Sequence, residues 1–226
     1  MIDERLYFVI LFVILTESIL KIITNWNMIT DNYNQLVIKR FASKGVFPYQ
    51  WAFTLLLPLR NIFLSPKQLI KRLELKENYF VLEVGSGPGY FSLPVARKLI
   101  AGKLYLADIQ QEMLDYAKKR FKKRKLENVE YYLCNGETFS FSDNFFDIIY
   151  MVAVIGEVEN KESYIKEFYR MLKPDGILSI SELAGDPDKM SIEELKDIIE
   201  KHNFKFYNNY GNKRNFTINF KKKCEY

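Results

Sequence analysis

From residue 79 onward, the hydrophobic positions of the chain alternate between two periods. Short apolar runs rich in β-branched residues have the spacing of buried strands, and the segments between them have the spacing of helices. The runs lie at 79–84, 103–107, 129–134, 146–152 and 177–182, and the helical segments lie at 90–100, 111–125 and 161–172. Strands that alternate with helices in this way predict a parallel sheet covered on both faces.

The two ends of this pattern complete the predicted fold. Ser65 and Pro66 have the form of an N-cap followed by proline at the first helical position, so a helix is expected to begin there. After a further helix at about 191–202, the segments 204–210 and 215–220 flank a polar turn, which predicts an antiparallel hairpin at one edge. We therefore expect an α/β fold, Rossmann-like and doubly wound, with a mostly parallel seven-stranded sheet.

The N-terminal segment is strongly apolar. Residues 6–24 are long enough to span a bilayer, although a central Glu17 costs about 2.5–3.5 kcal/mol and makes insertion marginal. Lys39, Arg40 and Lys44 follow the run, so the positive-inside rule would place the rest of the chain at the cytoplasmic face of the membrane. The alternative is a buried N-terminal hydrophobic helix in a cytoplasmic protein.

The next segment, 45–65, is rich in aromatic residues and leucine. Pro48 and Pro58 interrupt it, which favours short helices joined by bends. Such a segment could be a lid over a cleft, a surface that lies on a membrane, or simple packing onto the following domain. The sequence leaves these alternatives open.

Composition narrows the classes of protein. With 226 residues, 48% hydrophobic and 27% charged, the chain is long enough for one α/β domain and is ordinary for a globular protein. Lys and Arg exceed Asp and Glu by 33 to 28, which is too small a surplus to imply a nucleic-acid partner. The two cysteines, Cys134 and Cys224, are far apart, and His202 is the single histidine. These counts argue against a metal site, a disulfide framework and a Ser-His-Asp hydrolase, and they suit a reducing cytosol.

A glycine-rich turn follows the first strand. Gly85, Gly87 and Gly89 stand at alternate positions, Glu83 precedes them, and Asp108 ends the second strand twenty-one residues after Gly87. Glycine lets the backbone turn sharply and approach a ligand closely, and a carboxylate at the position of Asp108 can bind ribose hydroxyls. A dinucleotide-binding loop has the spacing Gly-x-Gly-x-x-Gly, which differs. An acid at 83 disfavours a pyrophosphate and favours a ligand with ammonium and sulfonium charges, such as S-adenosylmethionine.

Four stretches of the sequence in this order resemble the class I S-adenosylmethionine-dependent methyltransferases. They are VLEVGSGPG at 81–89, LADIQQEML at 106–114, NGE at 135–137 with FSDNFFD at 141–147, and RMLKPDGILSISE at 170–182. The branch with the ubiquinone/menaquinone C-methyltransferases is the most similar. The resemblance divides the chain into a hydrophobic helix and linker at 1–44 as a possible anchor, the segment 45–65, and a methyltransferase domain at 66–226.

The resemblance implies a set of residues that bind S-adenosyl-L-methionine. These are Glu83, Gly85, Ser86, Gly87, Gly89, Asp108, Ile109, Asn135, Gly136 and Met151. Asp108 should bind the ribose hydroxyls, and Ile109 should pack on the adenine. Asn135 stands where the family commonly has an Asp that faces the adenine amine, and Met151 should lie near the methionine moiety.

The acceptor and the catalytic residues are not identified by these motifs. Methyl transfer from a sulfonium needs alignment and exclusion of water more than a strong base. Candidates for a base are Glu157, Tyr150, Glu182 and His202. The leading hypothesis is a membrane-associated methyltransferase of a small lipophilic acceptor, quinone- or lipid-like. The alternatives are a soluble methyltransferase of a polar metabolite or protein, and a non-catalytic cofactor-binding subunit.

Overall fold

A computed structural model describes residues 46–223, apart from the side chains of Leu59 and Arg60. The chain divides between Lys44 and Gly45 into two units, and the described residues belong to the second. The apolar segment 6–24 and the predicted N-terminal helix lie outside the described residues. Within 46–223, no helix combines the length and apolar character needed to cross a membrane.

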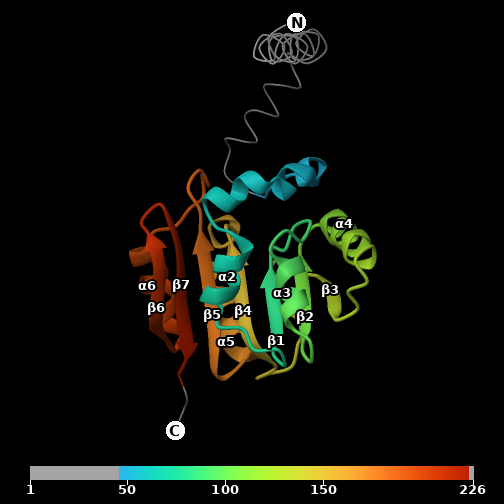
Figure 1. Cartoon of the computed structure of the whole chain (residues 1–226). Coiled ribbons are helices and arrows are strands. Elements are labelled where there is room, and N and C mark those ends of the chain that lie inside the picture. Colours follow the sequence, from blue (N-terminus) through green and yellow to red (C-terminus); the bar gives the residue numbers. More distant parts are fainter. Residues whose placement is uncertain (1–45, 224–226) are drawn as a thin grey trace, which may run out of the picture. The chain divides into compact units, whose positions relative to one another are not determined.

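The core of the fold is one mixed sheet of seven strands in the order β3-β2-β1-β4-β5-β7-β6 (Figure 1). The strands are β1 (Phe80–Val84), β2 (Lys103–Asp108), β3 (Val129–Leu133), β4 (Phe146–Val152), β5 (Leu172–Glu182), β6 (Phe204–Asn212) and β7 (Asn215–Lys222). The first five strands pair in parallel, and β7 is antiparallel to both β5 and β6. This order confirms the predicted Rossmann-like sheet with an antiparallel C-terminal hairpin.

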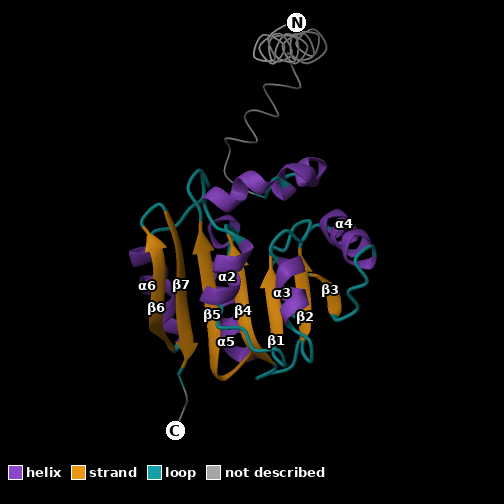
Figure 2. Cartoon of the chain, in the orientation of Figure 1, coloured by secondary structure: helices purple, strands orange, loops and turns teal. Residues whose placement is uncertain are grey.

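Helices cover both faces of the sheet (Figure 2). They are α2 (Pro66–Arg72), α3 (Ser92–Lys98), α4 (Gln111–Lys122), α5 (Lys161–Met171) and α6 (Ile192–Ile199), with short 3-10 turns η3 (Ile155–Glu157) and η4 (Glu200–His202). Local sequence explains where two of them begin. Ser65 and Gln68 form a capping box at the start of α2, and Ser191 and Glu194 form another at the start of α6.

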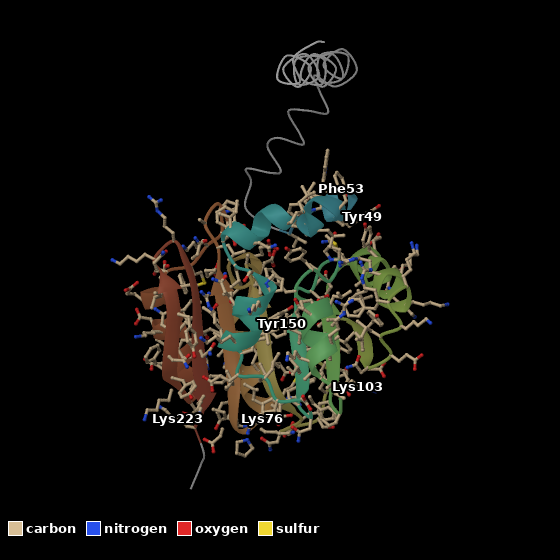
Figure 3. All side chains as sticks on the ribbon, in the orientation of Figure 1. Tyr49, Phe53, Lys76, Lys103, Tyr150 and Lys223 are labelled. Atoms are coloured by element: carbon tan, nitrogen blue, oxygen red, sulfur yellow. The ribbon has the colours of Figure 1, made fainter. Side chains whose placement is uncertain are left out.

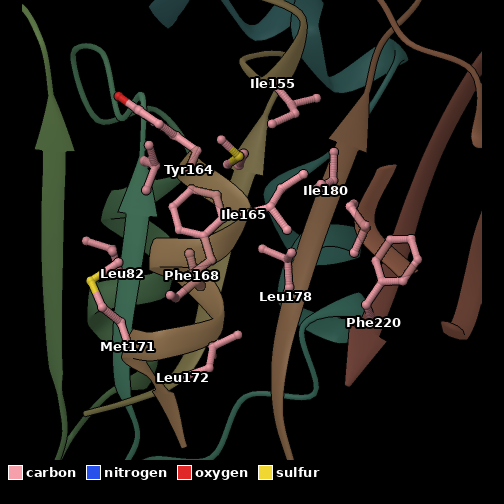
Figure 4. Packing of buried hydrophobic residues seen from close by; sticks show 14 of the residues in the cluster. Leu82, Ile155, Tyr164, Ile165, Phe168, Met171, Leu172, Leu178, Ile180 and Phe220 are labelled. Atoms are coloured by element: carbon pink, nitrogen blue, oxygen red, sulfur yellow. The ribbon is translucent and has the colours of Figure 1, made fainter. Parts of the chain in front are cut away.

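The two faces bury separate hydrophobic clusters. On one face, α5 and α6 pack on alternate residues of β1, β4 and β5. Figure 4 shows Phe168 and Ile165 of α5 beside Leu178 and Ile180 of β5. On the other face, residues of α2, α3 and α4 pack on the intervening positions, among them Val81 and Ile148. Burial on both faces explains why the strands read as apolar runs in the sequence.

Strand β5 begins five residues earlier than the predicted run at 177–182. Leu172 already pairs with Phe146, the register then shifts before Ile148 pairs with Ile177, and Asp175 takes a φ of 60°. Lys173 Nζ lies 2.8 Å from Asp147 Oδ1. Residues 173–176, which have the composition of a turn, therefore form an irregular start of the strand.

Candidate functional site

The turn after β1 is held in place by the backbone of its neighbours. The N–H groups of Gly85 and Ser86 donate to the carbonyl of Ala107 in β2, at 2.8 and 3.2 Å. Gly85 has a φ of 69°, and a Cβ there would lie 2.5 Å from Val154 Cγ2. Both the backbone conformation and the space require glycine at this position. The turn is thus fixed against the carboxyl ends of β1 and β2.

Asp108 joins this turn to the end of β2. Its Oδ2 accepts a hydrogen bond from Gly87 N at 2.8 Å, and its Oδ1 accepts one from Gln110 N at 3.0 Å. Burial raises the pKa of Asp108, and the N–H groups of Gln110, Gly87 and Ile109 act against that rise. A carboxylate offers about four acceptor positions, so others remain for the hydroxyls of a ligand.

Glu83 lies under the turn and is 3% exposed. Its Oε2 accepts a hydrogen bond of 2.6 Å from the hydroxyl of Tyr150, in the neighbouring strand β4. Burial and the nearby carboxylate raise the pKa of Tyr150 well above its usual range. Tyr150 is therefore a neutral donor that positions Glu83, and it is a poor candidate for a base.

In the same turn, Ser86 has a hydroxyl without a hydrogen-bond partner among the described residues, and Gly87 has open space beside its backbone. The hydroxyl of Ser86 is buried and has no hydrogen-bond partner among residues 46–223. A Cβ added at Gly87 would meet only the side chain of Leu55, at 3.6 Å. An unsatisfied buried hydroxyl beside an open glycine backbone fits a polar ligand that contacts main chain.

The other predicted cofactor residues are placed around the same edge, with different exposure. Ile109 follows Asp108 directly and is 44% exposed, which suits a surface for a flat ring. Asn135 Oδ1 already accepts from the N–H groups of Glu137 and Thr138, both at 2.9 Å, so it closes the turn after β3. Gly136 has a φ of 85° in that turn, and Met151 is fully buried in the core. The cofactor contacts assigned to these four residues stay predictions.

A segment that we call the strap, residues 46–64, runs across the carboxyl ends of the parallel strands (Figure 1). It contains two 3-10 helices, η1 (Tyr49–Leu56) and η2 (Pro58–Ile62). Gln110 holds its start, because the side-chain amide donates to Phe47 O at 2.7 Å and accepts from Tyr49 N at 3.2 Å. Tyr90 holds its end, since the hydroxyl donates to Asn61 Oδ1 at 2.8 Å. Together with Leu55 over Gly87, these contacts place the strap on the glycine turn.

An acidic cluster lies beyond β4 and β5 at the same edge. Glu182 ends β5 and is fully buried, and neither carboxyl oxygen makes a hydrogen bond of normal geometry within the described part of the chain. Burial and the charge of Asp186 raise its pKa to about 8. Burial, Asp186 and Asp188 likewise raise the pKa of Glu157, in η3, to about 8.

The fourth candidate for a base, His202, lies elsewhere. It precedes β6, which runs in the same direction as β5, so it stands at the opposite edge of the sheet from the glycine turn. Tyr150 is set aside because its pKa is raised well above its usual range, and His202 because it lies at the opposite edge, so Glu157 and Glu182 remain of the four candidates. The residues from 46 to 223 contain no cluster of three or more His, Cys, Asp or Glu arranged to hold a metal ion.

Sequence reasoning did not identify Gln110, Leu55 or Tyr90 as parts of this site. Gln110 stands two residues after the acid that ends β2, where a polar side chain could be expected to face the ligand edge. Its hydrogen bonds to residues more than sixty positions earlier carry no sequence signal. Leu55 belongs to an apolar segment whose facing could not be read from its pattern.

The raised pKa values of Glu157 and Glu182 make the free energy of unfolding depend on pH. The carboxyl groups of Glu157 and Glu182 have an ordinary pKa of 4.5, and in the folded chain this rises to about 8. Between these values the folded state holds more protons than the unfolded state, so stability falls as pH rises from about 4.5 to 8 and levels off above. Each group contributes up to about 1.4 kcal/mol per pH unit.

The variant Glu182→Gln is expected to flatten this fall, because an amide does not titrate. Urea midpoints measured between pH 5 and 9 give the slope for each variant. Glu162→Gln, at an exposed position on α5, is the matched control and should leave the slope unchanged. Equal slopes for Glu182→Gln and the parent chain would contradict a buried proton at this position.

The strand order, the glycine turn after β1 and the acid that ends β2 are features that the chain shares with the class I S-adenosylmethionine-dependent methyltransferases. Residues 82–180 match the family model described as methyltransferase domain. The resemblance seen in the sequence is thereby confirmed, and the cofactor of the class is S-adenosylmethionine.

Relatives and solved structures agree with this class. The chain is 34% identical over 135 residues to the ubiquinone/menaquinone biosynthesis C-methyltransferase UbiE of Rickettsia prowazekii, covering 58% of this chain and 51% of the relative. Identity to the UbiE of Pectobacterium atrosepticum is 29% over 131 residues, 57% of this chain and 51% of the relative. The alignments thus span about half the length of these relatives. A solved structure, a SAM dependent methyltransferase from Aquifex aeolicus, has a TM-score of 0.74 and 25% identity, and covers 78% of this chain and 100% of that one.

Proposed function

We propose that this protein binds S-adenosylmethionine at the glycine turn and transfers its methyl group to a small lipophilic acceptor. The observation that supports the cofactor site is the hydrogen bond of 2.8 Å between Gly87 N and Asp108 Oδ2, which fixes the turn relative to the acid that we propose binds the ribose. Preorganised contacts of this kind reduce the ordering that a ligand must impose when it binds.

The residues of the turn fit the parts of the cofactor. Asp108 would bind the two ribose hydroxyls, and the exposed side chain of Ile109 would lie against the adenine. The unpartnered hydroxyl of Ser86 and the open backbone at Gly87 would face the polar methionine portion. Glu83, held by Tyr150, would supply the negative charge that a positively charged ligand needs.

Two kinds of support favour a lipophilic acceptor. The relatives in Rickettsia prowazekii and Pectobacterium atrosepticum are named for ubiquinone and menaquinone biosynthesis, which concerns lipophilic quinones. In addition, the strap over the site is apolar on its inner side at Leu55. The predicted membrane contact of residues 6–24 agrees with this acceptor and stays a prediction.

For methyl transfer, the protein has to align the acceptor with the methyl group, exclude water and accept a proton from the acceptor. Bound S-adenosylmethionine supplies an electrophilic methyl group on a positively charged sulfur. The strap would exclude water from the reacting atoms, which strengthens the electrostatic interactions within the site. The acceptor atom that gains the methyl loses a proton, and the ionised form of Glu157 or Glu182 can accept it. Because both have a pKa of about 8, that ionised form grows as pH rises through 8.

The proposal is tested in two stages on the full chain. Calorimetric titration with S-adenosylmethionine is expected to show saturable binding with one site per chain. A transfer assay with radiolabelled methyl donor is then run on a lipid extract containing quinol precursors and on a polar extract. Label in the lipid extract is the expected result.

The alternatives give different outcomes in the same assay. Label found only in the polar extract would favour a methyltransferase of a polar metabolite or protein. Binding without transfer in either extract would favour a non-catalytic cofactor-binding subunit. Absence of binding to folded protein would overturn the cofactor site itself.

A further inference from the structure

The strap carries an unusually large share of the exposed apolar side chains, and we call its exposed side the outer face. Six of the eleven exposed large hydrophobic residues in the described part of the chain fall within 46–63. They are Val46, Tyr49, Phe53, Leu57, Ile62 and Phe63, with exposed fractions from 40% to 76%. Figure 3 shows Phe53 on the side of the strap that faces away from the sheet. Single exposed apolar residues are normal, whereas a contiguous set marks an interaction surface.

The segment that carries this face contains basic and no acidic residues. From residue 46 to residue 73 the sequence contains no Asp or Glu and four Lys or Arg. Two of the four, Lys67 and Lys71, are exposed on α2 directly after the strap. A protein partner is usually bound through a surface depleted in lysine, whereas an anionic lipid surface attracts lysine and accepts aromatic and aliphatic side chains at the level of its headgroups.

The inner side of the strap connects this face to the cofactor turn. Leu55 lies over Gly87, and the contacts of Gln110 and Tyr90 fix the strap at both ends. A molecule that left a lipid surface at the outer face would therefore be separated from the turn by the strap alone. This route is the one that a lipophilic acceptor requires, because such a molecule is concentrated in lipid and not in water.

We propose that the outer face of the strap docks on an anionic lipid surface, from which the methyl acceptor enters the site. The lipid surface is inferred from the exposed side chains and the charges, and the route of the acceptor rests on the proposed function. Docking is measured without cofactor or acceptor, so its failure is distinct from a failure of methyl transfer.

The test measures lipid contact at the strap itself. Trp51 lies in η1, and Trp26 is the single other tryptophan, so a full-length Trp26→Phe variant carries one fluorescent reporter on the strap. Vesicles of phosphatidylglycerol and phosphatidylcholine are prepared with and without bromine on the acyl chains. Emission of Trp51 is expected to be quenched by the brominated vesicles, and to be quenched less as phosphatidylglycerol is replaced by phosphatidylcholine.

Two isoleucines with nearly equal exposure provide a matched pair of variants. Ile62 is on the strap and 76% exposed, and Ile100 is 74% exposed just before β2, at the opposite edge of the sheet. In the Trp26→Phe background, Ile62→Glu is expected to weaken vesicle binding roughly five- to twentyfold, because it removes an apolar contact and adds a charge that anionic lipid repels. Ile100→Glu should leave binding unchanged, and thermal melts of both variants establish that they are folded.

Three results would overturn the proposal. Equal emission with brominated and unbrominated vesicles, although the protein binds them, would mean that other parts of the chain make the contact. Equal binding by Ile62→Glu and Ile100→Glu would exclude the strap as the docking face. A change in Trp51 emission that depends on protein concentration without lipid would assign the face to a second copy of the chain.

Discussion

Replacement of Asp108 by alanine is expected to weaken S-adenosylmethionine binding by about 2–4 kcal/mol, or roughly 30- to 1000-fold in dissociation constant. The carboxylate would make two hydrogen bonds to the ribose, each worth about 1.5–3 kcal/mol with partial compensation by water. It also accepts from Gly87 N at 2.8 Å, so its loss leaves that N–H unpaired and loosens the turn. Calorimetric titration gives the change directly.

A matched substitution separates a local effect from a general one. Asp115 is exposed on α4, the helix that follows Asp108, and its carboxylate accepts a hydrogen bond from Gln111 Nε2 at 2.9 Å. Asp115→Ala should bind the cofactor as the parent chain does. If Asp108→Ala retains full affinity while folded, the ribose assignment at the end of β2 is wrong.

Gly85→Ala is expected to destabilise the folded chain by about 2–5 kcal/mol. A side chain at a φ of 69° costs about 1–2 kcal/mol, and overpacking against Val154, whose Cγ atoms lie 2.5 and 2.7 Å from the added Cβ, costs about 1–3 kcal/mol more. Urea denaturation followed by circular dichroism measures the loss, and cofactor affinity should fall with it because the turn is displaced.

Gly136 provides the control for the backbone contribution. It also has a positive φ, of 85°, but a Cβ there would meet no atom within 4 Å. Gly136→Ala should therefore cost about 1–2 kcal/mol, the conformational part alone. Adding Val154→Ala to Gly85→Ala should recover part of the larger loss. Equal losses for the two glycines would show that contact with Val154 does not matter.

The sheet could be predicted because its elements have strong local signals. Parallel strands buried on both faces are continuous apolar runs, and the glycine turn and Asp108 stand at fixed positions relative to β1 and β2. The start of β5 was missed because Lys173 to Gly176 have the residues of a turn, and only the pairing of Leu172 with Phe146 brings them into the strand. Tertiary pairing overrides local preference there.

The surroundings of the site were less accessible to sequence reasoning. The sequence left open whether 45–65 forms a lid or packs on the domain, since its apolar residues show no single period. Its position is set by Gln110 and Tyr90, which are distant in the sequence. The raised pKa values of Glu157 and Glu182 likewise depend on burial and on Asp186, which a motif does not report.

Gln110 takes part in two contacts at once, and this has an energetic consequence. Its main-chain N–H donates to Asp108, and its side-chain amide binds the main chain of the strap at Phe47 and Tyr49. Binding at Asp108 and binding at the strap can therefore change each other's free energy through Gln110. Such a coupling is reciprocal: each event changes the other by the same amount. A ligand on Asp108 that strengthened the attachment of the strap would itself bind more tightly when the strap is attached. Occupancy of the cofactor site and attachment of the strap would then regulate each other.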